Sequence, residues 1–337
     1  MYESIRGAMR RSTTSILTTH AGSLPHLREP PPASEPELRE AVHRVVARQR
    51  GLGPDLVNEG EYTKGGDWLS FADGRFDGFE LRDAAGEVPL IPQGADRAQF
   101  ADFYRYASEK GTLFYSPGEQ ITTRRVKWTC TGPISYRGHE AVAREIALLR
   151  ASDPGEDAFL TSTAPASLEV SRDDAHYGDE EEYLYALADA LREEYELITE
   201  AGLVLQVDDA WLPALWDRIG IAMGIEAFRE RCAASAWPRS TTRCATCRRT
   251  RSDTTCAGEA GTVPTRLTWS CRSDVVEHPQ LVCQRIVRYA EAVGPGNVIA
   301  GTDCGFGGRS HPQIAWAKLG ALVEGARLAT AALGLAG

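Results

Sequence analysis

Long apolar runs are missing from this 337-residue sequence, and no stretch approaches the roughly 18 apolar residues of a membrane-spanning helix. The first residues, MYESIRGAMRRSTTS, also lack the apolar segment of a secretory signal, so we expect a cytoplasmic protein and no membrane partner. Positive charge is scarce too, because 37 Lys and Arg face 47 Asp and Glu. The formal net charge of −10 argues against nucleic acid as a partner and leaves small molecules or proteins.

Lysine is rare, with four of the 37 basic residues (Lys64, Lys110, Lys127 and Lys318), which indicates a GC-rich gene. Hydrophobic residues make up 42% of the chain and charged residues 25%, as in a globular protein with a sizeable core. The eight cysteines, in a chain without a secretory signal, favour thiols or metal ligands over disulfides.

Short apolar runs alternate with amphipathic stretches along most of the chain. Strands are expected at 15–20, 55–58, 125–130, 159–162, 203–207 and 297–301, and helices at 37–50, 138–151, 179–201, 275–293 and 311–334. Residues 73–121 show no clean period and are interpreted as a long excursion. The alternation indicates a parallel α/β architecture. No Gly-x-Gly-x-x-Gly follows the first strand, which favours a (β/α)8 TIM-like barrel over a doubly wound sheet.

We expect one domain, a barrel over 15–337 preceded by a flexible N-terminus at 1–14. Glycine and polar residues follow five of its expected strands. They are Gly22-Ser23, Gly60-Glu61, Thr131-Gly132, Asp208-Asp209 and Asp303-Cys304. The carboxyl ends of barrel strands share one rim, where barrel enzymes build their sites, so these residues should meet.

Each candidate residue also has a plainer interpretation. Cys304 could be a small buried hydrophobe, as most free cysteines are. Glu61 and nearby Glu59 could be a solvated pair, and Asp208 with Asp209 could form a helix-capping turn. Their positions directly after strands favour a functional use of Glu61 and Asp208.

Seven segments extend the pattern over most of 15–232 and 273–332. They are TTHAGSLP (18–25), LVNEGE (56–61), TCTGP (129–133), LTSTAP (160–165), LQVDDAWL (205–212), VVEHPQLVCQRIVRYAE (275–291) and VIAGTDCGFGGR (298–309). In this order they resemble the catalytic C-terminal barrel of the cobalamin-independent methionine synthase family, in its short single-barrel branch. The resemblance implies a zinc ion held by His, Cys, Glu and Cys.

The same resemblance implies roles for single residues. Cys304 corresponds to the last zinc ligand of the family, Gly22 and Ser23 to the turn that holds the amino-acid carboxylate, and Glu61 and Asp208 to the acids that take its ammonium. Zinc would deprotonate a homocysteine-type thiol, and the thiolate would accept a methyl group from a folate-type donor to give methionine. The implied activity is that of a 5-methyltetrahydropteroyltriglutamate-homocysteine S-methyltransferase-like enzyme. His20 should also face this pocket, although a lone histidine is more often structural.

The resemblance breaks between Asp209 and Val275, where the family carries His-x-Cys and Glu as zinc ligands. From 232 to 273 there is no histidine, and Asp253 and Glu259 are the only acids. Shifted by one base and written in GC-rich codons, 251–265 can encode IRYHLCWGSWHGPH, which contains a His-x-Cys pair. We therefore hypothesise that 233–272 is translated out of frame, which would disrupt the barrel, weaken or abolish zinc binding and impair activity.

Two other functions stay open. One is another barrel enzyme, a thiol-alkyl transferase or a uroporphyrinogen-decarboxylase-like enzyme, in which Glu61 and Asp208 would not contact a substrate amine. The other is a non-catalytic remnant with a zinc-binding segment at Cys244, Cys247, Cys256 and Cys271. The first two of these cysteines form a Cys-x-x-Cys pair, but fourteen residues separate the other two, which is not the spacing of a common zinc motif.

Overall fold

The computed structural model describes residues 11–27, 31–64, 70–88, 98–110, 124–155, 157–209, 216, 220–235 and 274–335. The segment predicted to be out of frame lies outside these residues, apart from its first three positions, 233–235. Most of the N-terminus predicted to be flexible also lies outside them, but Ser12 is buried and its hydroxyl donates to the Val298 carbonyl at 2.5 Å. None of the described helices is long and apolar enough to cross a membrane.

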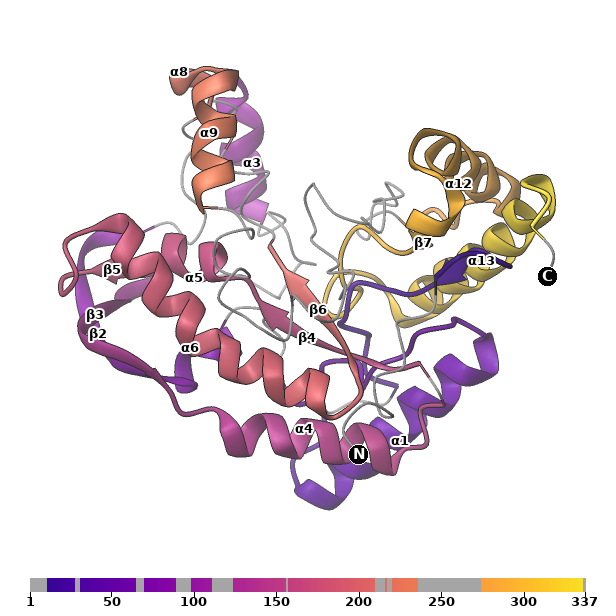
Figure 1. Ribbon diagram of the computed structural model, residues 1–337, viewed down its shortest axis with the longest axis horizontal. Helices are drawn as coiled ribbons and strands as arrows, with labels where there is room; N and C mark the ends of the chain where they lie inside the picture. Colours follow the sequence, from indigo (N-terminus) through magenta and orange to yellow (C-terminus); the bar gives the residue numbers. More distant parts are fainter. Residues whose placement is uncertain are drawn as a thin grey trace, which may run out of the picture.

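Helices and strands alternate, and most of the predicted elements are present (Figure 1). The strands are β1 (Leu17–Thr18), β2 (Phe76–Val88), β3 (Arg124–Tyr136), β4 (Phe159–Thr163), β5 (Asp173–Asp174), β6 (Val204–Asp208) and β7 (Ile299–Ala300). The α-helices are α1 (Glu35–Leu52), α3 (Ala101–Lys110), α4 (His139–Ala151), α5 (Pro165–Ser171), α6 (Glu180–Glu200), α8 (Ile221–Met223), α9 (Ile225–Ser235), α12 (Pro279–Val293) and α13 (Pro312–Ala332). Short 3-10 turns, η1 (Ser70–Gly74) and η3 (Pro295–Asn297), complete the described elements.

Parallel pairing places the candidate strand ends at one edge. β1 pairs with β7, and β4 pairs with β6 so that Thr163 lies opposite Asp208. Residues 56–57 connect the two pairs, since the Leu56 amide donates to the Thr18 carbonyl at 3.0 Å and Val57 bridges to Ala158 in parallel. The α/β class is therefore confirmed, with parallel pairing in β1–β7 and β4–β6 and antiparallel pairing in β2–β3. The described residues contain no closed sheet, so the TIM-like barrel stays a prediction.

The strand predicted at 125–130 belongs to a different sheet, in which β3 pairs antiparallel with β2, with Phe79 opposite Cys130, and parallel with β5. The prediction that it ends at Thr131-Gly132 is wrong, because β3 continues to Tyr136. Gly78 makes this possible: its φ is +91°, the register shifts beside it, and a Cβ there would lie 2.5 Å from the Pro133 carbonyl oxygen. The predicted excursion at 73–121 contains β2 and α3.

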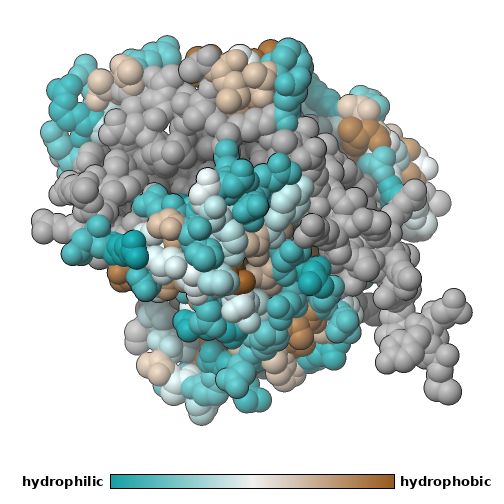
Figure 2. Space-filling model, turned by 60° about the vertical axis from the view of Figure 1, so that its left-hand side comes forward, coloured by the Kyte–Doolittle hydropathy of each residue, from teal (hydrophilic) through white to brown (hydrophobic). Residues whose placement is uncertain are grey.

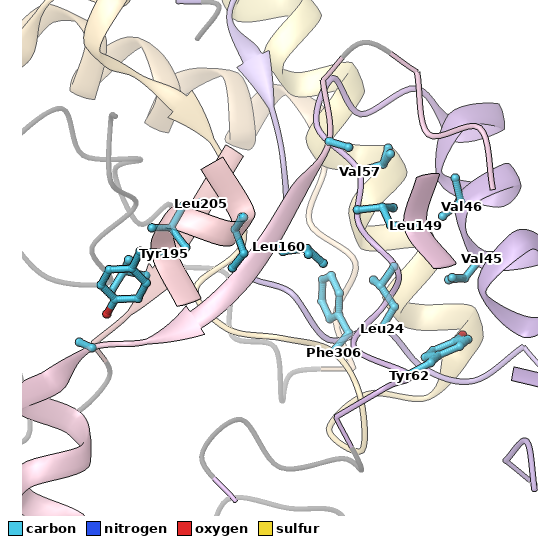
Figure 3. Packing of buried hydrophobic residues seen from close by; sticks show 14 of the residues in the cluster. Leu24, Val45, Val46, Val57, Tyr62, Leu149, Leu160, Tyr195, Leu205 and Phe306 are labelled. Carbon is cyan, nitrogen blue, oxygen red and sulfur yellow. The ribbon is translucent and has the colours of Figure 1, made fainter. Parts of the chain in front are cut away.

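The core lies between the parallel strands and the helices that cover them (Figure 3). α1 begins at the N-cap Ser34, ends at Gly53 with φ +99°, and buries one face that includes Val45 and Val46. Phe306 is fully buried in the same cluster, so the glycine-rich turn after β7 is anchored in the core. On the face shown in Figure 2, hydrophilic side chains predominate and hydrophobic ones are scattered.

Candidate functional site

The turns that follow β1 and β7 are packed against each other. The Ala21 amide donates to Thr302 Oγ1 at 3.0 Å, and the Phe306 amide donates to the Ser23 carbonyl at 2.8 Å. A Cβ at Gly305 would overlap the Ser23 hydroxyl, so a glycine is needed for this approach. The β1–β7 pairing thus brings Ser23 next to the turn that contains Cys304.

Gly22 lies directly against the carboxylate of Glu61. Its φ is +113°, and a Cβ there would be 2.5 Å from Glu61 Oε1 and 3.0 Å from Thr161 Cγ2. Glu61 itself has a φ of +59°, a left-handed conformation that is strained for a non-glycine residue and is found at functional sites. Its Oε1 accepts a hydrogen bond from Thr161 Oγ1 at 2.5 Å. The carboxylate is therefore held at a defined place beside the Gly22 backbone.

Asp208, at the end of β6, is the second acid of the candidate pocket that we assign to Gly22, Ser23 and Glu61. It accepts a hydrogen bond from Gln206 Nε2 at 2.9 Å. Burial, together with the negative charge of Glu61, raises the pKa of Asp208 to about 8; Cys304 raises it further and the positive charge of Lys64 opposes the rise. Glu61 and Cys304 thus both lie near enough to Asp208 to raise its pKa.

Asp209 points elsewhere, because its Oδ1 accepts a hydrogen bond from Ser167 on α5 at 3.0 Å. The two neighbouring acids therefore have different surroundings. Thr131-Gly132, the remaining predicted strand end, lies within the β2–β3 ladder and is not a strand end at this edge. Four of the five predicted strand ends meet.

Cys304 is half-buried, and its sulfur accepts a hydrogen bond from the Arg309 guanidinium. A neighbouring guanidinium favours the thiolate, but its positive charge disfavours a metal cation on the same sulfur. Among the described residues, no group of three or more His, Cys, Asp or Glu side chains could hold a metal ion. These residues alone do not fit zinc. Zinc therefore stays a prediction, and it would need ligands outside the described residues. The four cysteines of the alternative zinc segment also lie outside the described residues.

His20 has the structural role that is usual for a lone histidine. Its Nε2 lies 2.8 Å from Gln49 Oε1, its ring packs edge-on against Phe159, and the side chain is 1% exposed. Burial lowers the pKa of His20 to about 4, so the ring is neutral at physiological pH.

Three residues that the sequence analysis did not select lie directly behind Glu61. Lys64 is 4% exposed, and its Nζ donates to the Thr161 carbonyl at 2.5 Å and also to Thr161 Oγ1. Glu59 is fully buried, so the interpretation of Glu59 and Glu61 as a solvated pair is wrong. Burial raises the pKa of Glu59 to about 7, against the attraction of Lys64. The rarity of lysine was the one signal in the sequence that could have drawn attention to Lys64.

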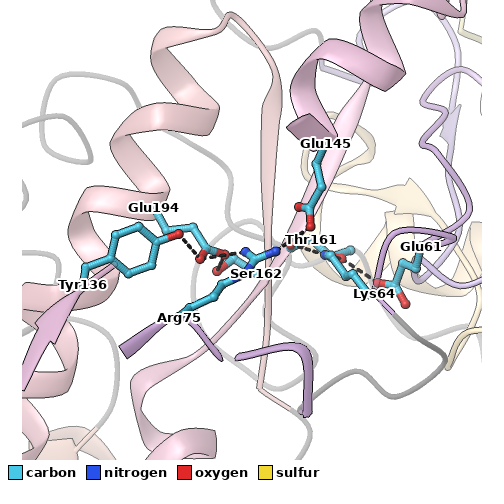
Figure 4. Close-up of polar contacts among 8 residues, drawn as sticks. All are labelled: Glu61, Lys64, Arg75, Tyr136, Glu145, Thr161, Ser162 and Glu194. Atoms are coloured by element: carbon cyan, nitrogen blue, oxygen red, sulfur yellow. Dashed lines mark hydrogen bonds and ion pairs between the residues drawn. The ribbon is translucent and has the colours of Figure 1, made fainter. Parts of the chain in front are cut away.

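A second buried network lies beside the hydrogen bonds of Lys64, Thr161 and Glu61, and it includes Ser162, the residue of β4 that follows Thr161 (Figure 4). Arg75 forms ion pairs with Glu194 at 2.8 Å and with Glu145 at 2.5 Å. Glu194 also accepts hydrogen bonds from Tyr136 at 2.6 Å and from Ser162 at 2.7 Å. Although burial opposes it, Arg75 lowers the pKa of Glu194, so this carboxylate is ionised. Thr161 and Ser162 thus connect β4 to two adjacent charge clusters, which influence each other because Glu145 experiences the charge of Lys64.

No protein-family model and no curated protein sequence matches the chain. Two solved structures are similar to it over nearly their whole lengths. A B12-independent methionine synthase from a Shewanella species, in complex with selenomethionine, has a TM-score of 0.62 and 17% identity, and the match covers 95% of this chain and 99% of that chain. A candidate vitamin-B12-independent methionine synthase from Listeria monocytogenes has a TM-score of 0.54 and 16% identity, with 93% and 98% covered. At these identities the likeness shows that the chain shares the fold of these structures.

Proposed function

We propose that the pocket binds the amino-acid end of a homocysteine-type thiol, and that the chain is an S-methyltransferase of the methionine-synthase type. One observation supports this above all: Glu61 and Asp208 follow separate strands, both are half-buried, and they lie near enough for the charge of Glu61 to raise the pKa of Asp208. Two like charges in such surroundings destabilise each other, and a ligand cation relieves this repulsion. The ammonium group of an amino acid is a cation of suitable size.

The Gly22-Ser23 turn would take the carboxylate of the same ligand. Gly22, with a φ of +113°, has no side chain that would block a ligand from its backbone, and Ser23 has a hydroxyl that can donate a hydrogen bond. The fold likeness adds support, because the Shewanella protein was solved with selenomethionine, an amino acid of this type.

The proposed reaction transfers a methyl group from a folate-type donor to the ligand sulfur. The thiol loses its proton, an S–CH3 bond forms, and the bond between the methyl group and the donor nitrogen breaks with its electron pair left on that nitrogen, which takes up a proton so that one proton is lost and one gained overall. Residues of the pocket contribute by orientation, since holding the amino-acid end limits where the sulfur can lie. The described residues do not fit zinc, so no step is assigned to a metal. We propose that catalysis by this chain is impaired, because the sequence between Asp209 and Val275 lacks the His-x-Cys pair that the family resemblance implies as zinc ligands.

Calorimetric titration tests the binding part of the proposal. Wild-type protein should bind L-homocysteine at least about tenfold more tightly than mercaptobutanoate, which has the same thiol and carboxylate but no amine. Asp208→Asn should reduce this preference, whereas Asp209→Asn should not, because Asp209 is bonded to Ser167. Equal affinity of the wild type for the two ligands would exclude an amine site and favour the other barrel enzymes.

Metal analysis of the purified protein separates the remaining alternatives. A single tightly held zinc that is lost in Cys304→Ser would support a catalytic metal of the methionine-synthase type. Zinc that is lost in Cys247→Ser and kept in Cys304→Ser would support the cysteine-rich binding segment. Protein without zinc would support the impaired enzyme.

A further inference from the structure

Lys64, Thr161 and Glu61 form a chain of hydrogen bonds whose direction is fixed by their chemistry (Figure 4). An ammonium group has no lone pair, so Lys64 can only donate to Thr161 Oγ1. The hydroxyl has a single proton, and with Lys64 as its donor that proton is directed to Glu61 Oε1 at 2.5 Å. Lys64 is anchored a second time by the Thr161 carbonyl at 2.5 Å.

Both supporting residues are shielded from water. Lys64 is 4% exposed and Thr161 is 2% exposed, and the Lys64 ammonium lies 4.6 Å from the centroid of the Phe71 ring. A buried ammonium is costly unless it is paired, and the acids that experience its charge include Glu59, Glu145 and Asp208. Lys64 can therefore fix the position of Glu61 through Thr161, and its positive charge also stabilises the ionised form of Asp208.

We propose that Lys64 and Thr161 are positioning residues that set the selectivity of the pocket for the ligand ammonium by fixing the carboxylate of Glu61. This inference rests on the proposed function. Without the Thr161 hydroxyl, Glu61 loses its described donor and can rotate away from the Gly22 backbone. Recognition of the amine should then weaken, while recognition of the rest of the ligand is retained.

Thr161→Val tests the proposal, because valine keeps the shape of threonine and the β-branch that suits a strand. Thr161→Ser keeps the hydroxyl, and Ser162→Ala is the matched control, since it removes a hydroxyl from the next residue of β4 that donates to Glu194 instead. Each variant is titrated with L-homocysteine and with mercaptobutanoate, and its unfolding temperature is measured. The ratio of the two affinities is the readout, because a general loss of stability does not change it.

The ratio should fall about tenfold in Thr161→Val and stay at the wild-type value in Thr161→Ser and in Ser162→Ala. Lys64→Met should also lower the ratio, because Thr161 then loses the donor that directs its hydroxyl proton to Glu61. A wild-type ratio in Thr161→Val, or an equal fall in Ser162→Ala, would overturn the inference even if wild-type protein prefers homocysteine. If wild-type protein shows no preference, the proposed function itself fails and the inference fails with it.

Discussion

Glu59 has a carboxylate without a hydrogen-bond partner for either oxygen among the described residues. The side chain is fully buried, and its pKa is raised to about 7 by burial and by the charges of Glu145 and Glu61, with Lys64 opposing. Because the folded-state pKa lies above the unfolded value, the folded protein holds more protons between these two pKa values. Stability from this group is therefore complete below about pH 4.5 and is lost as the pH rises to about 7.

Glu59→Gln should remove this pH dependence, since a neutral amide of nearly the same shape does not ionise. We expect the variant to gain stability relative to wild type by an amount on the order of 3 kcal/mol at pH 8, with a much smaller difference at pH 4.5. Urea unfolding of both proteins at the two pH values measures the difference. The same difference at both pH values would contradict the prediction.

Gly22→Ala should impair both the fold and the pocket. The new Cβ would lie 2.5 Å from Glu61 Oε1, and the φ of +113° strains any other residue by about 1–3 kcal/mol. Gly53→Ala is the control, because its φ is also positive at +99° while the nearest atom to its Cβ lies 3.8 Å away on Val323. Both variants should unfold at lower temperature, but only Gly22→Ala should lose the proposed binding of L-homocysteine by calorimetry. Equal loss in the control would show that strain alone is responsible.

At the scale of secondary-structure elements, Arg75 connects the β2–β3 pair to α4 and α6 through Glu145 and Glu194. Arg75→Met would remove the ion-pair partner of two buried carboxylates, so we expect a loss of about 3–5 kcal/mol in the free energy of unfolding. Arg82→Met removes an exposed ion pair with Glu80 and should cost about 0–1 kcal/mol. Chemical denaturation compares the two. Similar losses would mean that the buried network adds little to stability.

Two glycines of α13 should respond in opposite directions to the same substitution. A Cβ at Gly325 would overlap Val282 on α12, whereas the nearest atom to a Cβ at Gly320 is Leu52 Cδ1 at 3.5 Å, an ordinary contact. Gly320→Ala should therefore stabilise the protein by about 0.5–1 kcal/mol through helix propensity. Gly325→Ala should destabilise it by about 1–3 kcal/mol because the helices are forced apart. Thermal unfolding provides the comparison, and a stabilised Gly325→Ala would contradict the packing of these helices.

The sequence predicts elements well where one regular pattern determines them. Helices α1, α4 and α6 follow from apolar periodicity, and β4 and β6 follow from short apolar runs that end in polar residues. The strand through Thr131-Gly132 was mispredicted, because Gly and Pro normally end a strand and the bulge at distant Gly78 that accommodates Pro133 leaves no local signal. Thr161 was overlooked for a related reason: it lies within a strand, and its partners Lys64 and Glu61 come from a turn far away in the sequence.

At the scale of the whole molecule, we predict that the segment 233–272 decides whether the chain can carry a metal. We predict that resequencing the gene across these codons, with peptide mass spectrometry of the purified protein, will reveal a reading frame with a His-x-Cys pair. A confirmed in-frame Cys244-x-x-Cys247 would contradict the frameshift hypothesis and strengthen the cysteine-rich segment as a metal site.

The parallel pairing of β1 with β7 also has a consequence for biosynthesis. Ser12 and its partner Val298 are 286 residues apart, and the Ile16 amide donates to Thr330, 314 residues away. At about 5–20 residues per second, a ribosome needs roughly 15–60 seconds to add the residues between Ser12 and Val298. During that time one edge of β1 has no partner from the end of the chain, and an unpaired edge invites association with other strands. We therefore expect the nascent chain to bind chaperones until β7 has left the ribosome and can pair with β1.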